Sequence, residues 1–396
     1  MKIAIIGISS INNVGEYLLI ENTGFLARQS FDSAEFKVVE ISPDRKVIRK
    51  QYRIESYLAD RLGALSHHFP GLFRDILKKW SFQVRYSSYY IHLLKDADAV
   101  IYAFGMLKYS TQDANYLFYT LNSIAEKLHI PVFMNAMSVQ KYDAEDPRAK
   151  NLVEACTKKC VRMITTRDGV EELNELNAFY ASDRHSEKGR IATSMVADVA
   201  LWSPEALHLP RKAFPETIRT IGINVINLQQ FQLYGNNVTE EDFFDFYRNL
   251  ISDVTKNNYA YKLFSNGMDV NHESGKKIVN ALHLPQDTLL NIAGTPVEYV
   301  RMLCSFDCVF ATRLHTSITC YAFNIPVVAL VWDNKIRAFY RKIRRQSLTV
   351  EPEKLREANI VAMLEEASRH PYDEKLFGEL KGSTLQSFKD FARLIR

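Results

Sequence analysis

The feature that most constrains this chain is the regular alternation of short β-branched, apolar segments with longer amphipathic ones. Strand-like segments cover residues 2–8, 36–42, 97–104 and 131–138. Strands and helices that alternate at this spacing form parallel sheets, because each crossover helix returns the chain to the same edge of the sheet. The pattern continues through a helix near 147–160 and strands at 163–167 and around 193–202, so these residues are expected to form one doubly wound domain.

Residues 203–218 interrupt the pattern with three prolines and little periodicity, as a domain boundary does. A second series of strands and helices follows, and after about residue 350 the chain has only helical patterns. We therefore predict an α/β protein with two doubly wound Rossmann-like domains, residues 1–205 and 216–396, whose strand ends face a central cleft, the glycosyltransferase B-type architecture. The C-terminal helices could pack on the second domain or cross back to the first.

Composition excludes several other classes of protein. Hydrophobic residues make up 47% and charged residues 24% of the chain, which are ordinary globular values. The formal charge of +4 is too small to indicate nucleic-acid binding. The sequence has neither a signal-peptide pattern nor an apolar segment long enough for a membrane span, and this predicts a cytoplasmic protein.

The cysteines and the basic residues add two weaker expectations. Five cysteines form an odd, sparse set, typical of small buried side chains in a reducing compartment. The basic run at 341–345 is expected to be a solvated helix face or, alternatively, a contact with an anionic membrane surface or a lipid-linked phosphate. The second option would place the protein at the inner face of the plasma membrane.

The most informative segment for function is residues 307–339. A predicted strand ends at Arg313 and a helix begins near His315, so Arg313, Leu314 and His315 occupy a strand-to-helix turn. The free N–H groups of a helix N-terminus favour a bound anion. Arg313 could hold a carboxylate or phosphate with two hydrogen bonds, and His315 could donate a proton. A structural salt bridge and a capped carbonyl are the alternative explanation.

Other polar residues follow strands in the same way. Arg167 ends the strand at 163–167, where it could face the same cleft from the first domain or pair with a neighbouring acid. Lys335 follows Asp333 after the strand at 326–332 and could meet a phosphate, or Asp333 could simply cap the next helix. After the first strand, Asn12, Asn13 and Glu16 could bind sugar hydroxyls or cap the following helix.

These motifs resemble those of the polysaccharide pyruvyl transferase family. The resemblance rests on five elements. They are a loop after the first strand (Asn13 to Glu16), a strand ending in Arg-Asp (Arg167-Asp168), an Arg-Leu-His turn (Arg313-Leu314-His315), a Pro-x-x-x-Leu strand (Pro326 to Leu330) and an Asp-x-Lys element (Asp333 to Lys335). Two departures are Glu16, where the family usually has Asp, and the reduction of a glycine-rich loop to Gly105. The order and spacing span most of the chain.

The resemblance implies an enzyme that transfers a pyruvyl group from phosphoenolpyruvate to two hydroxyls of a saccharide as a ketal, in the biosynthesis of bacterial cell-surface polysaccharides. It implies that Arg167, Arg313, Leu314 and His315 surround phosphoenolpyruvate, with Lys335 as a weaker member. By the same resemblance the loop with Asn13 and Glu16 lies on the acceptor side, and the acceptor is free or lipid-linked.

The expected partners are therefore phosphoenolpyruvate and a saccharide, without nucleic acid, and an oligomer is compatible with these features. We expect neither a metal nor a cofactor, because no His, Cys and carboxylate residues recur with the spacing of metal ligands. Two other functions stay open: a nucleotide-sugar-dependent glycosyltransferase of the same fold, which fold alone does not exclude, and a saccharide-binding relative without catalysis.

Overall fold

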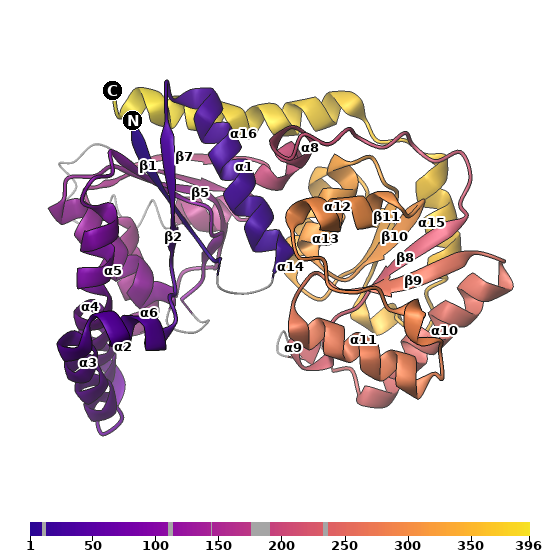
Figure 1. The fold of residues 1–396 in the computed structure, drawn as a ribbon, viewed down its shortest axis with the longest axis horizontal. Coiled ribbons are helices and arrows are strands. Elements are labelled where there is room, and N and C mark those ends of the chain that lie inside the picture. Colours follow the sequence, from indigo (N-terminus) through magenta and orange to yellow (C-terminus); the bar gives the residue numbers. More distant parts are fainter. Residues whose placement is uncertain (10–12, 110–113, 144, 176–190, 233–236) are drawn as a thin grey trace. The chain divides into compact units, whose positions relative to one another are not determined.

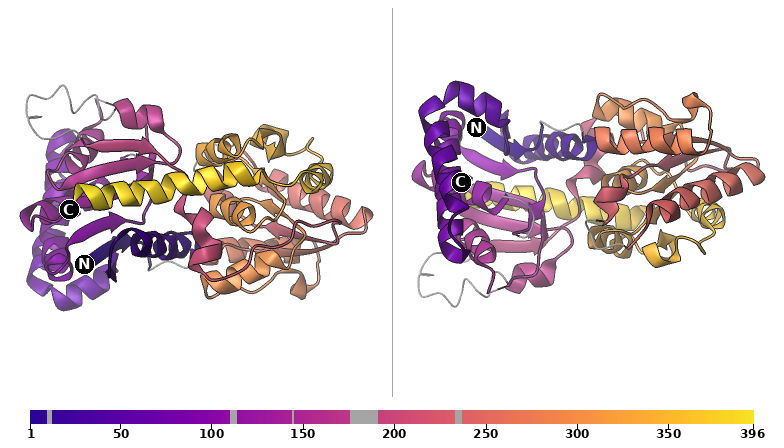
Figure 2. Two further views of the ribbon diagram at one scale, coloured as in Figure 1. Left: turned by 90° about the horizontal axis from the view of Figure 1, so that it is seen from above. Right: turned by 90° about the horizontal axis from the view of Figure 1, so that it is seen from below.

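The computed structural model describes residues 1–9, 13–109, 114–143, 145–175, 191–232 and 237–396, and Figures 1 and 2 show its ribbon from three sides. The chain forms two compact units. Unit 1 comprises residues 1–10, 23–197 and 382–396, and unit 2 comprises residues 11–22 and 198–381. Helices α1 (Val14–Ser30) and α16 (Glu374–Leu394) therefore each contribute residues to both units. The domain boundaries expected from the sequence, 1–205 and 216–396, stay a prediction.

Unit 1 is built on a parallel sheet in the order β2-β1-β3-β5-β6-β7, and the short β4 pairs with β5 outside this path. Its strands are β1 (Lys2–Gly7), β2 (Glu35–Glu40), β3 (Ala99–Tyr102), β4 (Met106–Leu107), β5 (Val132–Val139), β6 (Val161–Thr166) and β7 (Ala192–Met195). Its other helices are α2 (Arg45–Gln51), α3 (Arg53–Ser66), α4 (Gly71–Leu94), α5 (Ala114–Lys127) and α6 (Pro147–Cys156). Every residue of β3 and β5 is buried, as expected for central strands covered on both faces.

Unit 2 has a second parallel sheet in the order β12-β11-β10-β8-β9. Its strands are β8 (Thr220–Asn224), β9 (Ala260–Phe264), β10 (Cys308–Ala311), β11 (Val327–Leu330) and β12 (Thr349–Val350). Its helices are α8 (Ser203–Ala206), α9 (Leu228–Gln232), α10 (Glu240–Lys256), α11 (Asp269–Ala281), α12 (Pro296–Cys304), α13 (Leu314–Ala322), α14 (Asn334–Lys342) and α15 (Ile360–Arg369), with short 3₁₀ turns η1 (Val199–Trp202), η2 (Gln286–Thr288), η3 (Gln346–Leu348) and η4 (Pro352–Lys354). The two parallel sheets confirm the predicted pair of Rossmann-like α/β domains.

Two sequence expectations need revision. The strand expected around 193–202 ends at Met195, and residues 199–202 instead form the 3₁₀ turn η1. The reason is Asp198, whose carboxylate accepts the Ala200 N–H at 2.8 Å and so starts a turn rather than continuing the strand. The segment between β2 and β3 holds three helices, α2 to α4, where the sequence pattern indicated only a long insertion.

The expectation that the cysteines are buried apolar side chains is confirmed for Cys156, Cys160, Cys308 and Cys320, while Cys304 is half-buried, and all five are free thiols. Burial raises the pKa of the Cys160 thiol to about 12 and the pKa of Cys320 well above its usual range. Such thiols are not nucleophiles near neutral pH. No helix in the described ranges is long and apolar enough to cross a membrane.

Gly222 in β8 provides a test of core packing in unit 2. A Cβ at this position would lie 2.4 Å from the buried ring of Phe306, which cannot withdraw into solvent. We expect Gly222→Ala to lower the free energy of unfolding by about 1–3 kcal/mol through overpacking. The control is Gly378→Ala in helix α16, where nothing lies within 4 Å and alanine should be neutral or stabilising. Equal melting temperatures for the two variants would contradict this packing.

Candidate active site

The site in unit 2 begins at a point where the sheet topology changes direction. The chain leaves β8 for β9 on one side of the sheet, whereas β10 continues to β11 and β12 on the other side. Loops diverge at such a switch point and leave a crevice at the carboxyl ends of the two strands, where ligands of doubly wound sheets bind. Asn224 ends β8, and Thr312 and Arg313 follow β10, so these three residues lie at the switch point.

Asn224 organises this edge of the sheet. Its buried Oδ1 accepts three hydrogen bonds, from the Thr312 N–H at 3.2 Å and from the Thr312 and Thr316 hydroxyls at 3.1 Å each. Its Nδ2 donates to the Phe264 carbonyl at 3.2 Å, which ties β8 to the end of β9. The Tyr299 hydroxyl is 2.8 Å from the Thr316 hydroxyl, so α12 joins the same network. One amide thereby fixes the loop after β10 and the first turn of α13.

Arg313 is the N-cap residue of α13, and its own side chain makes no capping hydrogen bond. The guanidinium therefore lies beside the positive end of a helix dipole, an arrangement that favours an anion. The Arg313 guanidinium donates to Gln230 Oε1 of α9, lies 3.5 Å from the Met268 sulfur and sits over the Trp332 ring with its Cζ 5.3 Å from the centroid. These contacts hold a half-buried cation at the switch point.

His315 lies in the first turn of α13, with its ring between two other segments of unit 2. A Cβ on Gly15 would fall 2.3 Å from His315 Nδ1, so the imidazole packs directly on the glycine backbone at the start of α1. On the other side, His315 Nε2 is 3.8 Å from Asp198 Oδ2, and only 3% of the Asp198 side chain is exposed. The two atoms are beyond hydrogen-bond distance, so the buried carboxylate acts on the imidazole through its charge, which would stabilise a protonated ring.

Sequence reasoning missed Asp198, because residues 193–202 looked like a continuous strand. Asp is a preferred N-cap residue, so Asp198 directly before Val199, Ala200 and Leu201 could have marked the start of a helical turn at this position. The sequence also did not indicate that position 15 must be glycine to leave space for the His315 ring. Neither contact follows from local sequence, because each joins segments that are more than 100 residues apart.

The loop before α1 is tied to unit 2. Asn13 Oδ1 accepts from the Gly15 N–H at 3.2 Å and from the Asn266 amide at 3.1 Å, while the Val14 N–H donates to the Asn266 carbonyl at 3.1 Å. The structure therefore places Asn13 in the capping role that the sequence left open. Glu16 lies in the first turn of the same helix, one residue after Gly15. Asn12 lies outside the described residues.

Lys335 and Asp333 follow β11 in unit 2. Asp333 caps α14 by accepting the Lys335 N–H at 3.1 Å, and its second oxygen is 3.2 Å from Lys335 Nζ. Only 16% of the Lys335 side chain is exposed. The cap is thus present, but the lysine is an ion-pair partner of its own helix cap rather than a solvated side chain.

Arg167 belongs to unit 1, at the carboxyl end of β6. It is 8% exposed, and a Cβ on Gly105 would lie 3.2 Å from its Nη2. Gly105, the remnant of the expected glycine-rich loop, therefore leaves the space that the guanidinium occupies. Thr166 Oγ1 accepts the N–H groups of Asp168 at 3.3 Å and Gly169 at 3.0 Å, so the turn after β6 is closed by the threonine hydroxyl.

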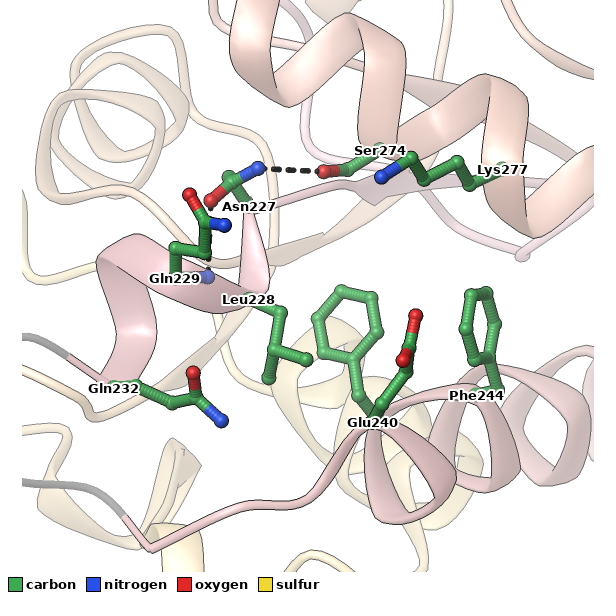
Figure 3. Close-up of a pocket in the computed structure, with 9 residues that line it drawn as sticks. Asn227, Leu228, Gln229, Gln232, Glu240, Phe244, Ser274 and Lys277 are labelled. Carbon is green, nitrogen blue, oxygen red and sulfur yellow. Dashed lines mark hydrogen bonds between the residues drawn. The ribbon is translucent and has the colours of Figure 1, made fainter.

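A separate pocket of about 370 Å³ lies in unit 2. Figure 3 shows its walls, which come from α9, α10 and α11 of unit 2: Asn227, Leu228, Gln229, Gln232, Glu240, Phe243, Phe244, Ser274 and Lys277. Asn227 Nδ2 donates to Ser274 Oγ at 3.1 Å across one wall. None of the residues predicted from the sequence to bind phosphoenolpyruvate lines this pocket.

Within the described ranges, no group of three or more His, Cys, Asp or Glu side chains is placed to hold a metal ion. The charged groups on the first turn of α13 are instead the Arg313 guanidinium and the His315 imidazole with the Asp198 carboxylate nearby, while the Lys335–Asp333 pair follows the neighbouring strand β11. This set can bind an anion and move a proton.

Comparison with solved structures defines the class of fold. The chain is similar to UDP-GlcNAc 2-epimerase from Methanocaldococcus jannaschii, with 12% sequence identity, a TM-score of 0.56, and coverage of 100% of this chain and 99% of that one. The same enzyme in complex with UDP-GlcNAc and UDP matches with a TM-score of 0.52 at 12% identity and the same coverage. At this identity the likeness shows the fold alone, a pair of Rossmann-like domains. No curated protein sequence matches the chain significantly.

The family follows from the sequence match. The model of the polysaccharide pyruvyl transferase family matches residues 13–334, most of the chain. The chain belongs to this family, as the motifs around Arg167 and Arg313 predict. Membership supports a transferase that acts in polysaccharide pyruvyl transfer.

The pair of His315 and Asp198 gives a sharp test of the site. Asn at position 198 can still accept the Ala200 N–H and keep the turn, but it removes the charge beside the imidazole. We expect Asp198→Asn to lower kcat roughly tenfold or more and to leave the melting temperature unchanged. The loss should be smaller than the 10²- to 10⁴-fold that a general acid itself contributes, because His315 is still present. A pH–rate profile identical to that of the wild type would show that Asp198 only caps η1.

Proposed function

We propose that this protein transfers the pyruvyl group of phosphoenolpyruvate to two hydroxyls of a saccharide, forming a pyruvate ketal and releasing phosphate. The observation that carries the proposal is that Arg313 and His315 lie together on the first turn of α13, at the switch point of unit 2. Family membership supports the pyruvyl chemistry in general. The donor, the ketal product and the roles of the residues are our assignment.

The donor carries two anionic groups, a carboxylate and a phosphate. Arg313 is suited to one of them because its planar guanidinium can donate two parallel hydrogen bonds, and the N–H groups at the start of α13 are suited to the same or the other anion. Its present partner, Gln230, is a neutral amide that an anion would displace at low cost. Lys335 is a weaker candidate because Asp333 already neutralises its charge.

Ketal formation needs one proton to be delivered and one leaving group to be stabilised. A proton adds to the methylene carbon of phosphoenolpyruvate while one sugar hydroxyl attacks the adjacent carbon. The attacked carbon becomes tetrahedral and still carries the phosphate. A second hydroxyl then forms the other C–O bond as the C–O bond to phosphate breaks. The two hydroxyl protons balance the new methyl C–H bond and the released phosphate.

His315 is assigned to the proton transfer, with Asp198 as its positioning residue. An imidazole can both accept and donate a proton, and the Asp198 carboxylate lies 3.8 Å from its Nε2. Arg313 would stabilise the negative charge that develops on the departing phosphate. Arg167 is assigned to the phosphoenolpyruvate site because it belongs to the family motif, and the activity of Arg167 variants tests this assignment.

The first test concerns the donor. Phosphoenolpyruvate should stabilise the protein by about 2.7 kcal/mol at 100 times its dissociation constant, whereas pyruvate at the same concentration should not, since it has no phosphate. Differential scanning fluorimetry with phosphoenolpyruvate, pyruvate, inorganic phosphate and a nucleotide sugar measures this. A melting temperature raised by the nucleotide sugar but not by millimolar phosphoenolpyruvate would favour a glycosyltransferase instead. Mass spectrometry of a panel of saccharides for one added pyruvyl unit identifies the acceptor.

The second test separates the two arginines from their packing roles. Arg313→Ala should lower kcat/KM by about 30-fold to several thousand-fold, the equivalent of about 2–5 kcal/mol, and Arg313→Lys should recover part of this. Gln230→Ala is the matched control, because it removes the partner of Arg313 and leaves the guanidinium. Arg167→Ala should also impair turnover, and Arg167→Lys serves as its packing control since Arg167 is buried. Wild-type kinetics for Arg313→Ala at a normal melting temperature would make Arg313 structural.

His315→Ala completes this series. It should lower kcat more than it weakens phosphoenolpyruvate binding, because its assigned role is proton transfer rather than binding.

A further inference from the structure

The segment from Arg45 to Trp80, which forms α2, α3 and the start of α4 in unit 1, has an unusual surface. The structure has fourteen large apolar side chains that are exposed in the described residues, and eight of them lie in this segment: Val47, Ile54, Tyr57, Leu58, Leu65, Phe69, Phe73 and Trp80. Single exposed apolar residues need no explanation, but a concentration of them marks an interaction surface. Figure 1 shows the hairpin of α3 and α4 extending beyond α5 and α6 of the same unit.

The apolar residues share one face of each helix. In α3, the exposed Ile54, Leu58 and Leu65 recur at intervals of four and seven residues, which places them on one side of the helix. Phe69 follows in the turn, and its ring centroid lies 5.5 Å from that of Phe73 at the start of α4. Trp80 comes two turns after Phe73 and is 54% exposed. The stripe thus continues around the tip of the hairpin.

The same segment is strongly basic. Residues 45–80 contain nine Lys or Arg against three Asp or Glu, a net charge of +6, which exceeds the +4 of the whole chain. The exposed positions of α2 are mostly basic, with Arg45, Lys46, Arg49 and Lys50 all exposed. A surface that combines basic groups with exposed aromatic and branched side chains is the pattern of helices that lie in the interface of an anionic membrane.

The acidic residues of the segment do not cancel this charge at the surface. Asp75 is 7% exposed and accepts the Tyr116 hydroxyl at 2.8 Å inside the unit. Asp60 accepts from two guanidinium groups, Arg49 at 2.5 Å and Arg85 at 2.7 Å. Glu55 is half-buried and accepts the Ser88 hydroxyl at 3.3 Å, and one of the nine basic residues, Lys79, pairs with Glu154 at 2.5 Å. The basic residues still outnumber these acids, so the surface keeps a net positive charge.

We propose that the surface of α2, α3 and the start of α4, residues 45–80, docks on an anionic lipid bilayer. The net positive charge of this surface is complementary to an anionic bilayer and not to a second copy of itself. A second copy of the same surface would place two sets of positive charge opposite each other, which is unfavourable for self-association. Lys and Arg stems and aromatic rings can enter the interfacial region while the charged groups meet lipid phosphates. A transferase held in this way meets saccharides on lipid carriers directly.

This surface differs from the basic run at 341–345, for which the sequence left membrane contact open as an alternative. No residue from 334 to 345 is an exposed large apolar side chain. Arg345 donates to the carbonyls of His370 at 3.0 Å and Pro371 at 2.7 Å, so part of that run serves the packing of unit 2. The membrane surface that we propose lies on unit 1 instead.

Sedimentation of the full-length protein with vesicles tests the proposal. Wild-type protein should bind phosphatidylcholine vesicles that contain about a third phosphatidylglycerol, bind pure phosphatidylcholine weakly, and lose binding as salt rises. Phe69→Ser/Phe73→Ser should weaken binding at least about tenfold, and Arg45→Glu/Lys46→Glu by about 25-fold or more, because each basic residue near the surface contributes on the order of fivefold. The tryptophan emission of the protein, to which Trp80 contributes, should shift further to the blue with anionic vesicles than with pure phosphatidylcholine.

The controls carry comparable changes elsewhere. Val270→Ser alters an exposed apolar residue of α11, and Arg341→Glu/Arg344→Glu reverses two charges in the other basic run. Both should bind vesicles as the wild type does, at unchanged melting temperatures. Absence of binding to the anionic vesicles by folded wild-type protein overturns the proposal, and so does equal weakening by the controls. A dimer that Phe69→Ser/Phe73→Ser dissociates, without vesicle binding, would identify the surface as a protein interface. None of these outcomes depends on pyruvyl transfer.

Discussion

The active-site edge of unit 2 depends on one buried amide. Asn224 Oδ1 receives three donors from the loop after β10 and the first turn of α13, and its Nδ2 reaches the end of β9. An unsatisfied amide in this fully buried position would cost about 1–3 kcal/mol, so the three donors have little freedom to move apart. Because those donors flank Arg313, the positions of Arg313 and of the first turn of α13 are set by a residue that need not touch a ligand.

Much of this architecture could be predicted from the sequence, and the reasons are physical. Short, nearly continuous apolar runs such as 131–138, separated by longer amphipathic segments, indicate parallel sheets that are covered on both faces. The turn at Arg313, Leu314 and His315 could be located because a strand pattern stops and a helix pattern starts within three residues. The family resemblance seen in these motifs agrees with the match of the family over residues 13–334.

The rest of the site could not be predicted, because it depends on contacts between distant segments. The sequence gives no sign that Gly15 receives the ring of His315 or that Gly105 makes room for Arg167, since a missing Cβ has meaning only when its neighbour is known. Asp198 was hidden because a single acid within an apolar run reads as an outward residue of a strand. The helices α2 to α4 were overlooked as an insertion, although α4 buries Tyr86, Tyr90 and Leu94 in the core of unit 1.

The contact between Gly15 and His315 also has a consequence for biosynthesis. Residues 11–22 group with unit 2, although the ribosome makes them almost 200 residues before the rest of that unit begins at Asp198. At about 5–20 residues per second, some tens of seconds pass before α13 emerges to cover the start of α1. During that interval the first turns of α1 are tethered to a nascent unit 1 but lack their final neighbours. The order of translation and the order of assembly therefore differ at the very residues that complete the site.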